Sequence, residues 1–97
     1  MSLFAELGMR YPIIQAPMAG VQNCELAMAV TGVGALGSLP AAMLGTAELR
    51  KALEQLAASG PGPFNINFFC HRQSEPDPAE EQRWREALAP YYAEFGV

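Results

Sequence analysis

The order of apolar segments along this chain predicts an α/β fold in which parallel strands alternate with helices. Segments of strand character begin near residues 13, 35 and 64, and helical patterns lie between and after them. Such alternation implies parallel strands joined by right-handed crossovers. Two architectures share this order, a doubly wound sheet and a TIM (β/α)8 barrel. A barrel needs about 250 residues, so a chain of 97 residues would supply its first three βα units and leave it incomplete.

Glycine and proline mark the ends of the first segments. Residues 3–7 have the pattern of a short helical turn that Gly8 can end. Pro12 sets an extended entry to two isoleucines, and β-branched residues favour a strand, which we expect over residues 13–16. Pro17 has no N–H with which to continue a backbone ladder, so the strand should stop there.

A second predicted helix is followed by the second predicted strand. Asn23 is a good N-cap for a helix over residues 24–30. This helix is apolar on all sides, so we expect it to be largely buried. Gly32 and Gly34 should end it, and residues 35–39 form the second predicted strand.

A third predicted helix and the third predicted strand follow in the same order. Thr46 is expected to cap the third helix, whose leucines form a single stripe at helical spacing. The stripe consists of Leu49, Leu53 and Leu56. The sequence SGPGP at residues 59–63 ends the helix, and residues 64–69 form the third predicted strand.

A last helix is signalled by its first turn. Asp77, Pro78 and Glu80 have the order of an acidic N-cap, a proline at the first helical position and a capping glutamate. Pro90 should break this helix in two or kink it. One face carries Trp84, Leu88, Tyr91 or Tyr92, and Phe95. We interpret the aromatic residues as packing of an outer-layer helix rather than as a cofactor cage.

Composition excludes several classes of protein. Hydrophobic residues make up 51% and charged residues 16%, which is not a disordered composition. The net charge is −4 and basic residues do not cluster, so we expect no nucleic-acid partner. Cys24 and Cys70 lack metal or redox spacing, as in a reducing compartment. Residues 1–10 lack the basic segment of a signal peptide, and no uncharged run approaches the ~20 residues of a membrane span without glycine and proline breaks. We therefore expect a cytoplasmic location and no membrane partner.

The sequence GVGALG at residues 32–37 matches the pattern G-x-G-x-x-G. Dinucleotide binding needs these glycines after a strand and at the start of a helix, so that the pyrophosphate meets the helix N-terminus. Here they follow a helix and run into a strand, which favours a structural role. Gly32 and Gly34 then end the helix, and Gly37 lets another backbone or a ligand approach the sheet closely.

The segment IIQAPMAG at residues 13–20 places a small, glycine-containing turn directly after the first strand. Ligands of α/β proteins lie at the carboxyl ends of the strands. The Pro–Met step between alanines leaves backbone N–H and C=O groups uncovered for a flat ligand, although an ordinary βα turn explains the same residues.

Two asparagines stand out in the third strand. Asn65 and Asn67 fall on one face, opposite Phe64, Ile66 and Phe68. The aromatic face belongs against helices, so the carboxamides should point to the opposite side, the interior of a barrel. We interpret Asn65 as a structural hydrogen-bonding residue. The residues alone leave open whether Asn67, nearer the carboxyl end, binds a ligand or is structural.

Cys70 and His71 follow the same strand and have the residue types of a nucleophile and its base. Adjacent residues of a strand point to opposite faces, so the two side chains should not face each other. We expect a buried thiol and a loop histidine.

Residues 11–44, YPIIQAPMAGVQNCELAMAVTGVGALGSLPAAML, resemble the opening of the nitronate monooxygenase family, also called 2-nitropropane dioxygenases. PFNINFF at residues 63–69 resembles the third strand of that family, and AEEQRWREALAPYYAEFGV at residues 79–97 is similar to its bacterial members. The resemblance therefore covers nearly the whole chain. It implies that residues 1–97 are the N-terminal segment of a single FMN-binding TIM barrel domain.

The resemblance also implies an activity and a cofactor site. Such enzymes use FMN to oxidise alkyl nitronates with dioxygen to a carbonyl compound and nitrite. By match to the family's motifs, Ala16, Pro17 and Met18 would lie against the flavin ring and Asn67 would contact it. The family's catalytic histidine and main phosphate-binding loops lie beyond residue 97, and His71 does not match that histidine. We therefore assign no catalytic residue and no metal ligand, and the oligomeric state stays open.

Two alternative functions remain at this point. Enoyl-ACP reductases that use FMN and NADH share the fold, but they more often carry QGGM where this chain has QAPM, which favours the nitronate branch. The other alternative is a non-catalytic truncated product. Whichever of the two barrel enzymes the chain belongs to, we expect residues 1–97 alone to be inactive, because five βα units would be missing.

Overall fold

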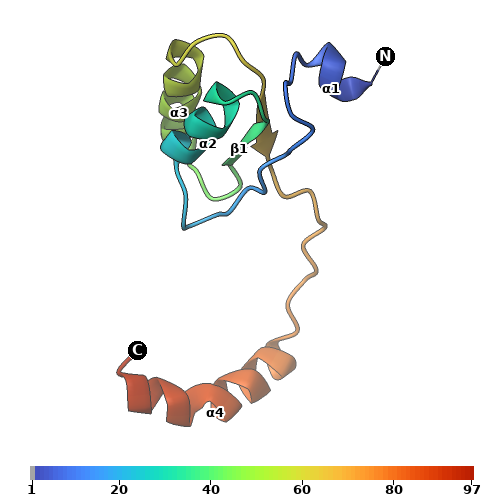
Figure 1. Ribbon diagram of the computed structural model, residues 1–97. Coiled ribbons are helices and arrows are strands. Elements are labelled where there is room, and N and C mark those ends of the chain that lie inside the picture. The colour runs from blue at the N-terminus through green and yellow to red at the C-terminus, as the bar shows by residue number, and fades with distance from the viewer. Residues whose placement is uncertain (1) are drawn as a thin grey trace.

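The computed structural model describes residues 2–97 and shows a mixed α/β arrangement followed by a separate helix (Figure 1). The elements are α1 (Leu3–Glu6), α2 (Cys24–Gly32), β1 (Gly37–Pro40), α3 (Thr46–Ala58), β2 (Phe64–Asn67) and α4 (Pro78–Phe95). None of the helices in this part of the chain is long and apolar enough to cross a membrane.

The strands are parallel, as the alternation of elements predicts. β1 pairs with β2 in a two-stranded sheet, with Ser38 opposite Asn65 and Pro40 opposite Asn67. The expected first strand at residues 13–16 is reduced to one parallel bridge between Ile14 and Leu36. Prolines on both sides of that segment remove ladder donors, so only a short stretch can pair with β1. The sheet of residues 2–97 does not close into a barrel.

Helices α2 and α3 cover one face of this sheet. Cys24 and Ala27 of α2 and Leu56 of α3 pack with Leu39 of β1 in a small buried cluster. Phe64 and Ile66 of β2 pack against the same cluster, which confirms this part of the predicted apolar face, whereas Phe68 lies beyond the end of β2 and is 53% exposed. The opposite face of the two strands carries the polar side chains that include Ser38 and Asn65.

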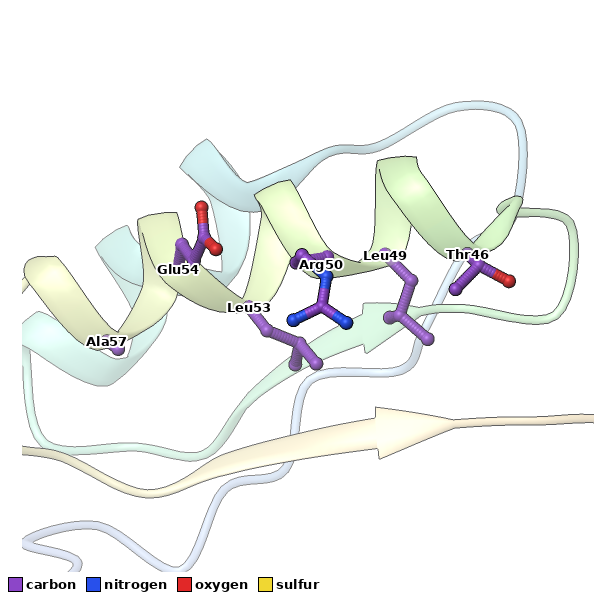
Figure 2. Close-up of a pocket in the computed structure, with 6 residues that line it drawn as sticks. All are labelled: Thr46, Leu49, Arg50, Leu53, Glu54 and Ala57. Carbon is purple, nitrogen blue, oxygen red and sulfur yellow. The ribbon is translucent and has the colours of Figure 1, made fainter.

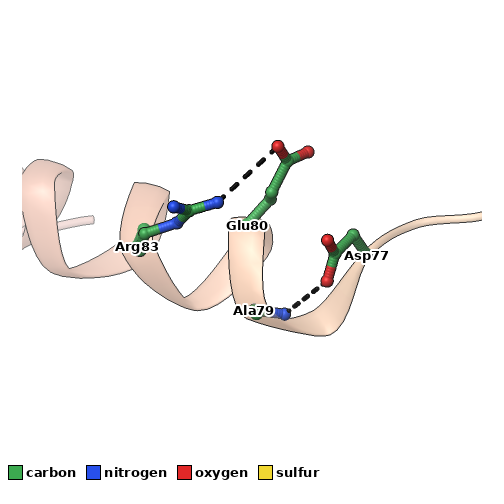
Figure 3. A network of polar contacts seen from close by, with 4 residues as sticks. All are labelled: Asp77, Ala79, Glu80 and Arg83. Carbon is green, nitrogen blue, oxygen red and sulfur yellow. Dashed lines mark hydrogen bonds and ion pairs between the residues drawn. The ribbon is translucent and has the colours of Figure 1, made fainter.

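Two of the three predicted helix caps are confirmed. The Asn23 side chain accepts from the backbone N–H of Glu25, and Asp77 accepts from Ala79 at 2.9 Å (Figure 3). The predicted cap at Thr46 is wrong, because Gly45 is the N-cap and Thr46 is the first helical residue. Glu48 reaches back instead, and its Oε2 accepts from the Gly45 N–H at 2.9 Å.

The predicted capping role of Glu80 is not seen at the start of α4. Its carboxylate pairs with the Arg83 guanidinium at 3.6 Å, along the exposed side of the helix (Figure 3). Of the two outcomes predicted for Pro90, the break is wrong, since α4 is continuous through that residue, and the kink stays a prediction. A proline inside a helix removes one backbone hydrogen bond, and the remaining bonds keep this helix whole.

The predicted burial of the helices holds only in part. Leu26 of α2 is 38% exposed, so the expectation that this apolar helix is largely buried is wrong. Of the α3 stripe only Leu56 is buried, and Leu53 is exposed. An apolar pattern predicts which face of a helix is buried once another helix or strand packs against it. Residues 2–97 do not contain all of the helices and strands that would cover these faces.

Helix α4 shows this most clearly, because it stands away from the sheet (Figure 1). It has no buried residue, and Trp84 and Phe95 are 67% and 71% exposed. The radius of gyration is 19.2 Å, against about 13 Å for a compact domain of this size. The predicted packing of its aromatic face is therefore absent within residues 2–97.

The two cysteines lie in different surroundings. Cys24 is buried under α3, where its thiol donates to the carbonyl oxygen of Ala52 at 3.6 Å. Burial raises the pKa of the Cys24 thiol, and the neighbouring Glu25 carboxylate raises it further. Cys70 is exposed, so the expectation of a buried thiol there is wrong. The strand ends at Asn67, and the residues after it have no layer to pack against.

Candidate functional site at the carboxyl edge of the sheet

The carboxyl ends of the parallel segments meet at one edge of the sheet. The turn with Ala16, Pro17 and Met18 follows the bridge at Ile14, and Asn67 ends β2. Because these segments and β1 run in the same direction, this turn and Asn67 come to the same edge. The structure therefore places the four residues that the sequence singles out at the same end of the sheet, on segments that flank β1.

Pro17 ends the pairing with β1 for a definite reason. Upstream of it, the Leu36 N–H donates to the Ile13 carbonyl and the Gln15 N–H donates to the Leu36 carbonyl, each at 2.9 Å. The next two bonds of a parallel ladder would run from the Ser38 N–H to the Gln15 carbonyl and from an N–H of Pro17 to the Ser38 carbonyl. Pro17 has none, so backbone pairing stops there, as predicted.

Two glutamine side chains take over where the backbone ladder stops. The Ser38 N–H donates to Gln15 Oε1 at 3.0 Å, and Gln22 Nε2 donates to the Ser38 carbonyl oxygen at 2.8 Å. Both backbone groups of Ser38 on this side are thereby satisfied by carboxamides rather than by a strand. This matters because Ser38 is completely buried and an unpaired buried carbonyl is costly.

The same glutamines hold the turn itself. Gln22 Oε1 accepts from the Met18 N–H at 2.9 Å and from Gln15 Nε2 at 2.7 Å. Gln15 Nε2 also donates to the Ala16 carbonyl at 3.0 Å. The turn is thus tied to β1 by one continuous network of carboxamides, while Met18 itself is 42% exposed.

The two asparagines of β2 differ in their partners. Asn65 Nδ2 donates to the buried hydroxyl of Ser38 at 3.0 Å, which confirms its structural role. The backbone of Asn67 accepts from the Ala41 N–H at 2.9 Å. Among residues 2–97 its half-buried carboxamide has no side-chain partner. It is a donor and acceptor available at the edge.

A family model described as nitronate monooxygenase matches residues 2–96. The chain belongs to the nitronate monooxygenase family.

Curated relatives agree with this assignment. The chain is 45% identical over 96 residues to the nitronate monooxygenase of Paraburkholderia phytofirmans and 43% identical over 91 residues to that of Pseudomonas aeruginosa. These alignments cover 99% and 94% of this chain but 26% of each relative. The chain thus spans about a quarter of the length of the curated relatives it matches.

A solved structure gives the same picture. The chain matches a nitroalkane oxidase from Streptomyces ansochromogenes with a TM-score of 0.81 and 30% sequence identity, over 99% of this chain and 27% of that one. A score of this size over almost the whole chain indicates that the arrangement of residues 2–97 is a family arrangement.

The motif G-x-G-x-x-G is structural in this family member. Gly32 ends α2, Gly34 has a φ of +94°, and Gly37 lies in β1 directly against α2. A Cβ at Gly37 would stand 2.0 Å from the Ala27 carbonyl oxygen. It is therefore another backbone, and not a ligand, that approaches the sheet at Gly37.

The remaining polar residues near the edge form no second site. His71 lies in an exposed loop, as predicted, with its ring centroid 6.0 Å from that of Phe69. Residues 2–97 contain no group of three or more His, Cys, Asp or Glu side chains that could hold a metal ion.

A hollow of about 330 Å³ lies between α2, α3 and the carboxyl end of β1, where Gln22, Leu39 and Pro40 line it, and two other hollows are surfaces of single helices. One of about 400 Å³ is lined only by residues of α3, including Leu49, Arg50 and Leu53 (Figure 2). Another is lined by one face of α4 around Trp84. A site that orients a ligand needs polar groups converging from several elements. Surfaces of single helices are instead places where a neighbouring element packs.

Sequence reasoning missed Gln15, Gln22 and Ser38. A signal for them exists in the sequence, because a proline in a strand deprives the neighbouring strand of a donor. Long carboxamides on both sides of Pro17, at Gln15 and Gln22, are the side chains that can replace it.

Proposed function

We propose that this chain supplies the first three βα units of an FMN-binding barrel that oxidises alkyl nitronates with dioxygen to a carbonyl compound and nitrite. Family membership supports the reaction, and the relatives named above carry the name nitronate monooxygenase. The observation that carries the proposal is the convergence of the turn at residues 16–18 and Asn67 at one sheet edge. Ligands of α/β barrels lie at that edge.

The residues at this edge fit a flavin. Ala16, Ala19 and Gly20 make a turn with little side-chain bulk, and a Cβ at Gly20 would meet no atom within 4 Å. A planar ring can therefore approach the backbone closely. The free carboxamide of Asn67 offers the donor and acceptor that a flavin edge requires. FMN, when bound, would accept electrons from the nitronate and pass them to dioxygen.

The roles of this chain's own residues follow from their positions. Ala16, Pro17 and Met18 would support the face of the flavin, and Asn67 would hydrogen-bond to its edge. Groups that tune a flavin act through such contacts. The proton-transferring residue belongs to the rest of the barrel, and no residue of this chain is assigned that step.

One experiment separates this function from its main alternative. The complete enzyme can be obtained as the extended reading frame, or as the Pseudomonas aeruginosa relative with its matching segment replaced by residues 2–96. Under anaerobic conditions we expect an alkyl nitronate to bleach the flavin absorbance. Reduction by NADH but not by nitronate would instead assign an enoyl-ACP reductase-like activity. A complete enzyme that binds no flavin would reject both.

Asn67 should matter to the cofactor more than to the fold. We expect Asn67→Ala in the complete enzyme to raise the Kd for FMN about tenfold, the equivalent of one lost hydrogen bond to a ligand. The unfolding temperature of the apoenzyme should change little, because the carboxamide has no side-chain partner in residues 2–97. Flavin fluorescence titration and thermal unfolding measure the two effects.

Asn65→Ala is the matched control, two residues earlier on the same face. It removes the donor to the buried Ser38 hydroxyl and should cost about 1–3 kcal/mol of stability. FMN affinity measured well below the unfolding temperature should then hold. An unchanged Kd and flavin spectrum in Asn67→Ala would remove Asn67 from the site.

A further inference from the structure

We propose that Gln22 and Gln15 are positioning residues of the cofactor site. Their side chains hold the turn at residues 16–18 in the position in which it can support a flavin. This inference rests on the proposed function. It assigns a role to two side chains that lie behind the turn rather than on the ligand side of it.

Gln22 joins two segments that the backbone leaves unjoined. Its Oε1 accepts from the Met18 N–H at 2.9 Å, and its Nε2 donates to the Ser38 carbonyl at 2.8 Å. One carboxamide thus fixes the distance between the turn and β1. Gln15 closes the network, because its Nε2 donates to Gln22 Oε1 and its Oε1 accepts from the Ser38 N–H.

The turn has no other firm support. Met18 is 42% exposed and Val21 80% exposed, so side-chain packing does not hold them. The internal hydrogen bond of the turn, from the Val21 N–H to the Met18 carbonyl, is long at 3.4 Å. The position of the turn is therefore set by the two carboxamides, and Pro17 makes the Gln22 bond necessary because it leaves the Ser38 carbonyl without a backbone donor.

The first test is Gln22→Met in the complete enzyme, which keeps the length of the side chain and removes all of its hydrogen bonds. We expect the Kd for FMN, measured by fluorescence titration well below the unfolding temperature, to rise about tenfold or more. The absorbance spectrum of the bound flavin should shift, because the turn no longer holds its place. A residue with a structural role alone would lower the apoenzyme's unfolding temperature and leave both readouts unchanged.

The second test is Gln22→Glu, which gives a pH signature. At neutral pH its carboxylate can still accept from Met18 but has no proton to donate to the Ser38 carbonyl. A glutamic acid titrates near pH ~4.3, and protonation restores the donor. Relative to the unsubstituted enzyme, FMN affinity in Gln22→Glu should therefore stay low from pH 8 to about 5 and recover as the pH is lowered towards ~4.

Gln82→Met is the matched control, because Gln82 also donates a side-chain hydrogen bond, to Glu86 at 2.9 Å, but on the exposed surface of α4. It should leave the Kd unchanged. The inference is overturned if the unsubstituted enzyme binds FMN and both Gln22 variants bind it with the same Kd and spectrum. It is also overturned if both variants fail to fold while Gln82→Met folds, since Gln22 would then serve folding. An unsubstituted enzyme that binds no FMN rejects the proposed function itself, before any variant is compared.

Discussion

The 97-residue chain, purified alone, should emerge from gel filtration without FMN, whereas the complete enzyme should retain it. The reason is geometric, since the sheet of residues 2–97 has two strands and one additional bridge and does not surround a ligand. The turn at residues 16–18 and Asn67 offer only one side of a site. Pockets that hold a cofactor bury most of its surface. Flavin absorbance in the protein peak measures the outcome.

The same chain should associate with itself. Its exposed aromatic residues include Phe68, Phe69, Trp84, Tyr91 and Phe95. Exposed apolar area on this scale marks surfaces that bind other protein surfaces or aggregate, and the edges of the short sheet add unpaired backbone groups. Light scattering should show species larger than 10.4 kDa. A monodisperse monomer with stoichiometric FMN would contradict this prediction and the geometry behind it.

Local chemistry in the sequence accounts for much of the fold. Asn23 and Asp77 cap the helices that follow them, because their side-chain oxygens reach the free N–H groups of the first turn. Pro17 ends the first pairing, and the apolar face of β2 lies against helices. These features depend on neighbours within a few residues, and the sequence displays those neighbours directly.

Features that depend on distant partners could not be predicted in the same way. Whether Leu26 or Trp84 is buried depends on elements that residues 2–97 do not contain. The apolar pattern around these residues therefore predicted a burial that is absent within residues 2–97. A local feature was also mispredicted, because Gly45 is the cap in place of Thr46 and the Glu48 side chain, three residues on, satisfies the Gly45 N–H. The carboxamides of Gln15 and Gln22 meet Ser38 only after the chain has folded back.

Among glycine-to-alanine substitutions in residues 2–97, Gly37→Ala should have the largest effect on stability. A Cβ there would stand 2.0 Å from the carbonyl oxygen of Ala27 and 2.8 Å from Thr31 Oγ1. The first of these is backbone in the middle of α2, so the helix itself must move. Thr31 would be displaced too, and its hydroxyl accepts from the Gly37 N–H and donates to the Pro63 carbonyl, each at 3.1 Å.

The two hydrogen bonds of the Thr31 hydroxyl therefore join α2 to the starts of both strands, and the substitution disturbs all three elements. Overpacking of this kind costs about 3 kcal/mol or more, and thermal unfolding of the complete enzyme should show it as a fall of several degrees. Gly32→Ala is the control from the same motif, because a Cβ at Gly32 meets nothing within 4 Å and the residue is helical. Alanine there should leave the unfolding temperature unchanged or raise it. Equal effects of the two substitutions would show that α2 does not pack on β1 at Gly37. The packing of α2 on β1 could then no longer explain why the turn and Asn67 lie at the same edge of the sheet.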